Sequence, residues 1–122
     1  MNRFFLNILS DDIEATATFY QQVFGMQRHF DSDWFVILNH AEMPAHELGI
    51  LKRDAEIVPD TGRGPFGGGL VTLVVEDCDT TFERATLAGA EVVEPPKLMP
   101  YGQRRALVRD PAGALLDISS PA

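Results

Sequence analysis

The sequence has 122 residues and a mass of 13.5 kDa, the size of one ordinary domain, and 45% of its residues are hydrophobic. Its 18 acidic and 10 basic residues give a formal net charge of −8, and such a surface repels nucleic-acid phosphates and anionic lipid surfaces. The single cysteine, Cys78, excludes an internal disulfide and suits a reducing compartment. With neither a signal peptide nor a membrane-length apolar run, we expect a cytoplasmic protein that binds no nucleic acid and no membrane.

In the first half of the chain, alternation of apolar and polar residues predicts a strand over residues 3–8. Asp11 followed by Glu14 is typical of a capping box, so we expect a helix to begin there and to end at Gly25. Its apolar stripe comprises Ile13, Ala17, Phe19, Tyr20, Val23 and Phe24. Three further strands are expected at residues 26–30, 34–38 and 46–52.

Residues 54–69 are rich in glycine and proline, which predicts a flexible connection between two structured halves. A strand is expected at 70–75, and a helix follows, with Thr80 and Glu83 as a second capping box and Gly89 at its end. The remaining strands are expected at residues 91–94, 104–109 and 115–118. A turn at 110–113 joins the last two strands as a hairpin.

The two halves repeat one pattern. Asp12 and Asp77 lie 65 positions apart, Gly25 and Gly89 lie 64 apart, and residues 6–9 resemble residues 71–74. The sequence therefore predicts an α+β fold of two βαβββ repeats, which form a curved mixed sheet with helices on its outer face. The expected boundaries of this single domain are 3–53 for repeat one, 54–69 for the linker and 70–119 for repeat two.

This doubled unit resembles the vicinal oxygen chelate superfamily, which includes glyoxalase I, extradiol dioxygenases, epimerases and bleomycin- and mitomycin-resistance proteins. The matching segments are residues 12–14, 19–20 and 24–25 in the first half and residues 75–79 and 88–90 in the second. The stretches 101–104 and 108–113 are the most family-like. The resemblance covers nearly the whole chain and is specific for the fold, but one scaffold hosts many chemistries.

The resemblance also implies where a divalent metal would be held, at Phe5, Glu47, Leu70 and Asp117. The family has histidine or glutamine at the first and third of these positions. Phe5 and Leu70 have no lone pair to offer, and two carboxylates are fewer than the three protein ligands that catalytic zinc sites ordinarily use. We therefore expect neither a metal nor another cofactor at these positions.

The cavity expected on the helix-free side is mostly apolar with a few polar groups, as in many small-molecule sites. Phe5 and Trp34 would stack on a planar ligand, and Asn7 and Thr72 would donate or accept hydrogen bonds. The complete predicted ligand-binding set is Phe5, Asn7, Trp34, Glu47, Leu70, Thr72, Tyr101, Arg104 and Asp117.

Glu47 and Asp117 are the only candidate catalytic residues. If both faced an apolar cavity, desolvation and mutual repulsion would raise a pKa and create an acid or base. The competing interpretation puts them at a wet rim or neutralises them with Arg104 or Arg105.

Three other features are interpreted as structural. The histidines His29, His40 and His46 show no metal-ligand spacing, and His40 and His46 belong with Glu42 to one turn region whose polar residues are expected to be solvated. The glycines at 62, 64 and 67 match a dinucleotide fingerprint in letters only, because Pro65 interrupts it and a strand follows. Cys78 is expected to be an inert small residue between two aspartates.

The leading functional hypothesis is a metal-independent binding protein for a small, planar aromatic molecule, resembling the resistance members of the superfamily. We expect a homodimer, because a small curved sheet leaves apolar faces to cover. Two alternatives remain open. One is a glyoxalase-like lyase, isomerase or dioxygenase using a divalent metal or a carboxylate base, and the other is a protein-interaction module with an empty cleft.

Overall fold

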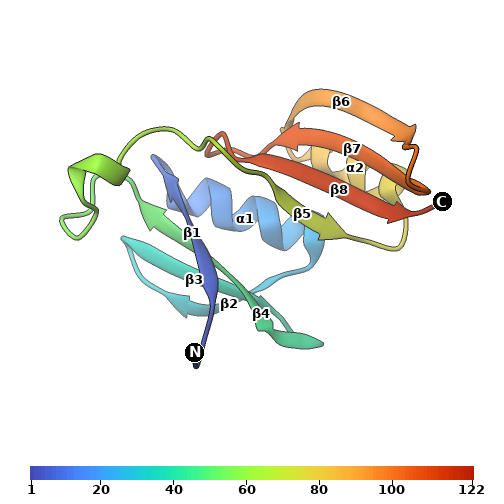
Figure 1. Cartoon of the computed structure of the whole chain (residues 1–122). Helices are drawn as coiled ribbons and strands as arrows, with labels where there is room; N and C mark the ends of the chain where they lie inside the picture. Colours follow the sequence, from blue (N-terminus) through green and yellow to red (C-terminus); the bar gives the residue numbers. More distant parts are fainter.

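A computed structural model describes residues 1–122 and shows two halves, each built as a strand, a helix and three further strands (Figure 1). The first half comprises β1 (Phe5–Ser10), α1 (Ile13–Phe24), β2 (Gln27–Asp31), β3 (Phe35–His40) and β4 (Met43–Lys52). The second comprises β5 (Val71–Val74), α2 (Cys78–Leu87), β6 (Glu91–Leu98), β7 (Gln103–Arg109) and β8 (Leu115–Pro121). The predicted α+β fold of two βαβββ repeats is confirmed.

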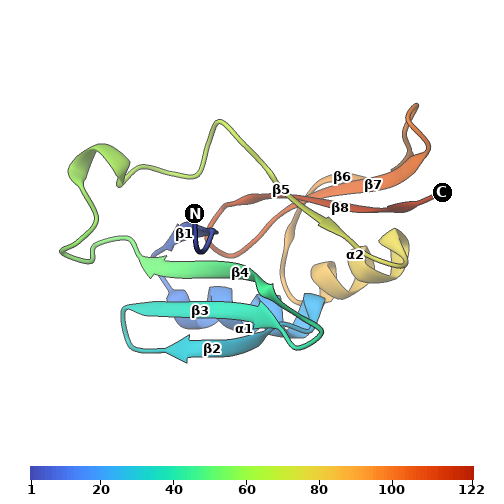
Figure 2. The ribbon, with the colours of Figure 1, turned by 60° about the horizontal axis from the view of Figure 1, so that its bottom comes forward.

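Each half forms its own four-stranded mixed sheet, in the orders β1-β4-β3-β2 and β5-β8-β7-β6. The first strand of each half runs parallel to the last, and the other pairs are antiparallel. The expected curved sheet is thus two sheets without a shared strand pair, and β1 and β5 each keep one free edge. In Figure 2, α1 lies against the first sheet and α2 against the second. Neither helix has the length and apolar character needed to cross a bilayer.

The core lies on the helix-covered side of both sheets and joins the two halves. A single cluster of 17 buried apolar residues includes Ile8 and Tyr20 from the first half and Cys78 and Ile118 from the second. The Tyr20 hydroxyl donates to Asp110 Oδ2 at 2.5 Å, which connects α1 to the turn between β7 and β8. Because the helices share this core, the opposite faces of both sheets carry no helix.

The N-terminal cap of each helix is a different residue from the one that the predicted capping boxes give. The Asp12 side chain accepts from the Ala15 amide at 3.0 Å, whereas Asp11 pairs with Arg53 at 2.8 Å. In the second half, the Asp77 side chain accepts from the Thr80 amide at 3.1 Å. The expected capping roles of Asp11 and Thr80 are therefore wrong, because the residue just before each helix already satisfies its first free amides. The two real caps are the aspartates that define the 65-residue repeat.

The strand expected at residues 91–94 is longer than predicted, since β6 continues through Pro95 and Pro96 to Leu98. Pairing with β7 shifts between Glu94 and Lys97, so neither proline has to donate to the ladder. β6 is also an edge strand, where prolines are tolerated.

Candidate functional site

Four aromatic side chains gather on the helix-free face of the first sheet. Phe5, from β1, is on the opposite face from buried Ile8, as strand alternation requires. The Phe35 ring lies 6.4 Å from Phe5, 6.0 Å from Phe30 and 5.6 Å from Trp34, measured between centroids. Phe30 and Trp34 remain 47% and 39% exposed. We call these four residues the aromatic cluster; it offers a partly exposed surface suited to stacking.

The Asn7 side chain lies beside this cluster over a glycine. Asn7 on β1 is paired with Gly49 on β4. A Cβ atom at residue 49 would come within 2.0 Å of Asn7 Oδ1 and 3.1 Å of the Phe35 ring. The absent side chain at Gly49 therefore makes room for the Asn7 carboxamide, a donor and acceptor next to the aromatic rings.

Glu47 is neutralised by an arginine that the sequence interpretation did not consider. Arg3 Nε donates to Glu47 Oε2 at 2.8 Å, and Arg3 Nη2 contacts Oε1. The Arg3 guanidinium also lies 5.0 Å from the centre of the Phe5 ring. Hydrogen bonding from Arg3 lowers the pKa of Glu47 below its ordinary value. Glu47 is thus an ionised, paired carboxylate, and Arg3 takes the neutralising role considered for Arg104 or Arg105.

A second polar group lies on the helix-free face of the second sheet. Asp117 accepts from Thr72 Oγ1 at 3.1 Å and from Ser119 Oγ at 2.6 Å. In the first half Phe5 is paired with Glu47. In the second half Asp117 is paired with Thr72, which lies two residues after Leu70, the residue equivalent to Phe5. Asp117 is therefore two residues beyond the position equivalent to Glu47.

The other predicted site residues are dispersed. Arg104 alternates with Arg105 on β7, shares the helix-covered face with buried Ala106, and donates to Asp79 at 2.9 Å. Tyr101 is 61% exposed in the turn between β6 and β7. No hydrogen bond or aromatic contact joins the first-half group Phe5, Asn7, Trp34 and Glu47 to the second-half group Leu70, Thr72 and Asp117.

The residues present do not fit a divalent metal at the family positions. Phe5 and Leu70 carry no donor atoms, and Glu47 is engaged by Arg3. No three side chains of His, Cys, Asp or Glu come together in a way that could hold an ion. The expected turn position of His40 and His46 is wrong, because His40 ends β3 and His46 lies in β4, and His29 likewise lies in a strand, β2. His40 Nδ1 accepts from the Glu42 amide at 3.2 Å.

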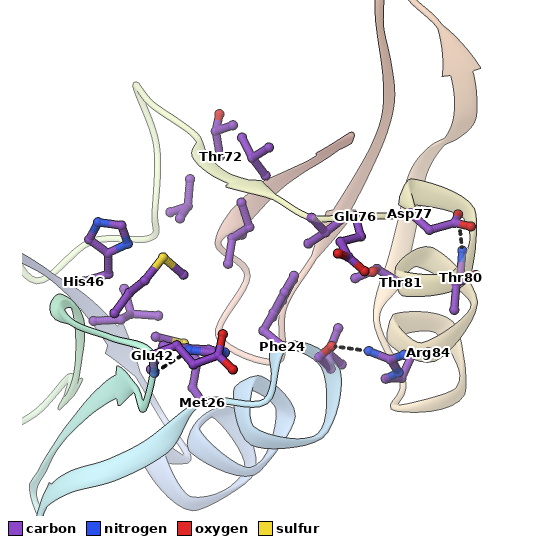
Figure 3. A pocket seen from close by; sticks show the side chains of 18 of the residues that line it. Phe24, Met26, Glu42, His46, Thr72, Glu76, Asp77, Thr80, Thr81 and Arg84 are labelled. Carbon is purple, nitrogen blue, oxygen red and sulfur yellow. Dashed lines mark hydrogen bonds between the residues drawn. The ribbon is translucent and has the colours of Figure 1, made fainter. Parts of the chain in front are cut away.

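A groove of about 900 Å³ separates the two halves on one side of the molecule (Figure 3). We call it the seam groove; its walls come from the end of α1, the β3–β4 hairpin, β5 and the start of α2. Of the predicted ligand-binding residues, Glu47 and Thr72 line it. The full lining is Val23, Phe24, Met26, His40, Glu42, Met43, His46, Glu47, Leu48, Val71, Thr72, Leu73, Val74, Val75, Glu76, Asp77, Thr80, Thr81 and Arg84.

Two structural interpretations from the sequence are confirmed. Cys78 is buried, its Sγ donates to the Ile118 carbonyl at 3.2 Å, and burial raises the pKa of its thiol. The thiol is therefore protected and poorly nucleophilic. The glycine-rich stretch at 62–67 begins at the end of a 3-10 turn (Asp60–Gly62), is irregular from residue 63 and leads into β5, with no α-helix after it to receive a pyrophosphate.

Taken together, the doubled βαβββ units and their helix-free sheet faces define the class of glyoxalase-like proteins. The family model for the Glyoxalase/Bleomycin resistance protein/Dioxygenase superfamily matches residues 4–118, and the chain belongs to that superfamily. A search of curated proteins found no significant match.

Solved structures agree with this fold. A glyoxalase/bleomycin resistance protein/dioxygenase family enzyme from Burkholderia phytofirmans PsJN is 26% identical, with 97% of each chain covered and a TM-score of 0.82. A superfamily member from Sphaerobacter thermophilus DSM 20745 is 23% identical, with 98% of this chain and 97% of that one covered and a TM-score of 0.77. TioX from Micromonospora sp. ML1 is 21% identical over the whole of both chains, with a TM-score of 0.69.

Proposed function

We propose that this protein binds a small planar aromatic molecule without using a metal, in the manner of the resistance members of its superfamily. The observation that carries the proposal is the aromatic cluster, which includes Phe5 at a position where the metal-binding relatives need a ligand. A planar ligand would stack on Trp34 and Phe30, and the Asn7 carboxamide would satisfy one polar group at its edge.

The charges around the cluster support capture rather than proton transfer. Glu47 is ionised and held by two contacts from Arg3, so it is poorly placed to take up a proton. Asp117 lies on the other sheet and is occupied by two hydroxyl donors. The proposed mechanism is stoichiometric binding in the cytoplasm, with no bond made or broken.

We also propose that two copies of the chain pair through their helix-free faces. Apolar side chains remain exposed on these sheets, among them Phe30 at 47%, Leu70 at 51% and Val74 at 69%. Covering such side chains with a second sheet would bury apolar area and would enclose the ligand. Light scattering after size exclusion should give the mass of a dimer; a monomer at all accessible concentrations would contradict this arrangement.

The fluorescence of Trp34 tests the binding function directly, since it is the only tryptophan in the chain. We expect a planar heterocycle from a drug panel to quench it saturably at one equivalent per chain. Phe30→Leu should weaken binding about threefold to tenfold through loss of stacking. Phe4→Leu is the matched control, because Phe4 is 74% exposed and outside the cluster.

Metal analysis separates this function from the metal-dependent alternative. Protein purified without a chelator should contain no stoichiometric divalent ion, and added Zn²⁺ or Mn²⁺ should not change ligand affinity. A tightly bound ion at one equivalent, or a panel without any saturable quencher, would refute the proposal.

A further inference from the structure

The seam groove has features that the proposed function leaves unexplained. It lies between the two halves, and several of its wall residues belong to the helix-covered side of the sheets, including Leu48, Val71 and Leu73. Glu47 and Thr72 extend the lining to the helix-free side, but none of the four residues of the aromatic cluster belongs to it. The two surfaces are therefore different candidate sites.

The interior of the groove is apolar. Phe24 and Met26, from the end of α1 and the residues after it, point into the groove (Figure 3), and Val71, Leu73 and Val75 also line it. These side chains are only partly buried, although all of them also pack against the core. At about 900 Å³, the groove is at the upper end of the size range of small-molecule sites.

One wall is the free edge of β5. In a parallel pair, the amide and carbonyl of one residue point to the same side, and successive residues alternate. The Val75 amide donates to the Ser119 carbonyl of β8 at 2.8 Å. The alternate residues Thr72 and Val74 consequently direct their backbone groups away from β8, along the groove. Their carbonyls are acceptors available to a ligand that donates hydrogen bonds.

The rim is negatively charged. Figure 3 shows Glu42 on one side of the groove and Glu76 and Asp77 on the other. Neither Glu42 nor Glu76 makes an ion pair. Arg84 is the one arginine in the lining, and its Nη1 donates to the Val23 carbonyl at 3.0 Å. An apolar floor with unpaired carboxylates on both rims complements a ligand with a hydrophobic body and a cationic head.

We propose that the seam groove is a second ligand site, which binds amphipathic amines. The hydrophobic body lies between Phe24, Met26 and Leu73. The ammonium group donates to the Thr72 or Val74 carbonyl and lies within the field of Glu42 and Glu76.

Three phenylalkyl probes of equal length test this proposal: 4-phenylbutylamine, 4-phenylbutanol and 4-phenylbutyrate. In ¹H–¹⁵N spectra, we expect saturable shifts centred on residues 71–75 and on Met26. The amine should bind most tightly, the alcohol more weakly and the carboxylate not measurably. Added salt should weaken binding of the amine but not of the alcohol, because only the amine depends on charge.

The variant Glu42→Gln/Glu76→Gln removes the two unpaired carboxylates. Each change should weaken binding of the amine about twofold to fivefold, as is typical of exposed charge pairs, and leave the alcohol unaffected. Asp77 is left intact because it caps α2. Glu56→Gln/Glu91→Gln is the matched control, because both of its glutamates are exposed, make no ion pair and lie outside the groove.

Several outcomes would overturn the inference. One is equal binding of amine and carboxylate, and another is equal loss of affinity in both double variants. A third is a set of shifts confined to Phe5, Phe30 and Trp34, which would assign the probes to the aromatic cluster. If probe binding disappears as protein concentration rises, a second copy of the chain fills the groove. If heterocycles do not quench Trp34 while the amine still binds, the proposed function is refuted and the second site is not.

Discussion

At the scale of single residues, the contact between Tyr20 and Asp110 couples the two halves through buried polar atoms. Burial raises the pKa of Asp110, although it accepts from Tyr20 and from the amides of Ala112 and Ala114. Burial, reinforced by the charge of Asp110, raises the pKa of Tyr20 well above its ordinary value. The hydroxyl therefore keeps its proton in the folded protein at a pH where an unfolded tyrosine would lose it.

Tyr20→Phe should lower the free energy of unfolding by about 2 kcal/mol at neutral pH, because Asp110 loses a hydrogen-bond donor in a buried site. A raised folded-state pKa gives stability that is complete below the unfolded-state pKa of about 10 and is lost as the pH rises through the folded-state value. The wild-type protein should therefore lose stability above about pH 10, and the difference from Tyr20→Phe should shrink there. Urea unfolding at several pH values measures both effects.

Tyr101→Phe is the control for this pair, because Tyr101 is exposed and outside the core. It should unfold as the wild type does at neutral pH and keep the alkaline loss of stability. If Tyr20→Phe showed the same alkaline loss as the wild type, another group would have to cause it.

Gly49 tests how tightly the Asn7 side chain is held. Gly49→Ala would force the Asn7 carboxamide to move and would press the Phe35 ring, since the new Cβ approaches both. We expect a loss of stability of about 1 kcal/mol, as in mild overpacking. In Asn7→Ala/Gly49→Ala the carboxamide is gone and only the contact with the Phe35 ring remains, so the double variant should cost less than the sum of its parts. Additive costs in a thermal or urea double-mutant cycle would mean that Asn7 does not occupy this space.

Strand alternation predicted part of the arrangement at the candidate site. It put Phe5 and Asn7 on one face of β1, as the structure shows. Trp34, named as a stacking residue without such an argument, lies against Phe35. Phe30 and Phe35 were missed, although alternation along the third strand separates Phe35 from buried Val36 and contained the signal. The ion pair of Arg3 with Glu47 could not be found in this way, because it joins residues 44 positions apart.

At the scale of elements, the linker differs most from its prediction. Composition predicts a flexible connection at 54–69, but two arginines hold it. Arg63 Nη1 donates to the carbonyls of Arg53 and Ala55 at 2.9 and 3.2 Å, and Arg63 Nη2 contacts the Val58 carbonyl. Arg53 in turn donates to the Gly64 carbonyl at 2.6 Å. The Val58 side chain in this segment is buried.

Arg63→Ala should release this segment. The carbonyls that Arg63 satisfies would turn to solvent, so residues 54–69 should be cleaved faster by a protease while the melting temperature falls by only a few degrees, as expected for about 1 kcal/mol. Arg109→Ala is the control, because Arg109 donates to the Gly113 carbonyl in the last hairpin. Equal cleavage of the linker in both variants would show that composition alone sets its mobility.

The ends of the elements were harder to predict than their order. The sequence order of strands and helices follows from hydrophobic periodicity, and it was predicted throughout. Asp12 rather than Asp11 caps α1, because the first helical residue is Ile13 and because Asp11 pairs with Arg53 instead. Likewise, the extension of β6 past Pro95 depends on its place at the sheet edge. These choices are made by tertiary contacts, which local propensity does not contain.

At the scale of the whole molecule, the repeat does not produce two independent units. The buried cluster takes residues from both halves, and the two sheets share no strand pair. Each helix has the other half as part of its surroundings, as the donation from Arg84 to the Val23 carbonyl illustrates. Separating the halves would expose apolar surface on both, so we expect them to unfold together, as small domains usually do.

Each half contains one natural reporter of this cooperativity. Trp34 reports on the first half by fluorescence, and a short thiol-labelling pulse reports on buried Cys78 in the second. Both signals should change at the same urea concentration. Ile8→Val, a change of about 1 kcal/mol in the first half, should lower both midpoints equally, because the Ile8 side chain belongs to the shared cluster. A shift of the Trp34 midpoint with an unchanged Cys78 midpoint would mean that the halves fold separately and meet only afterwards.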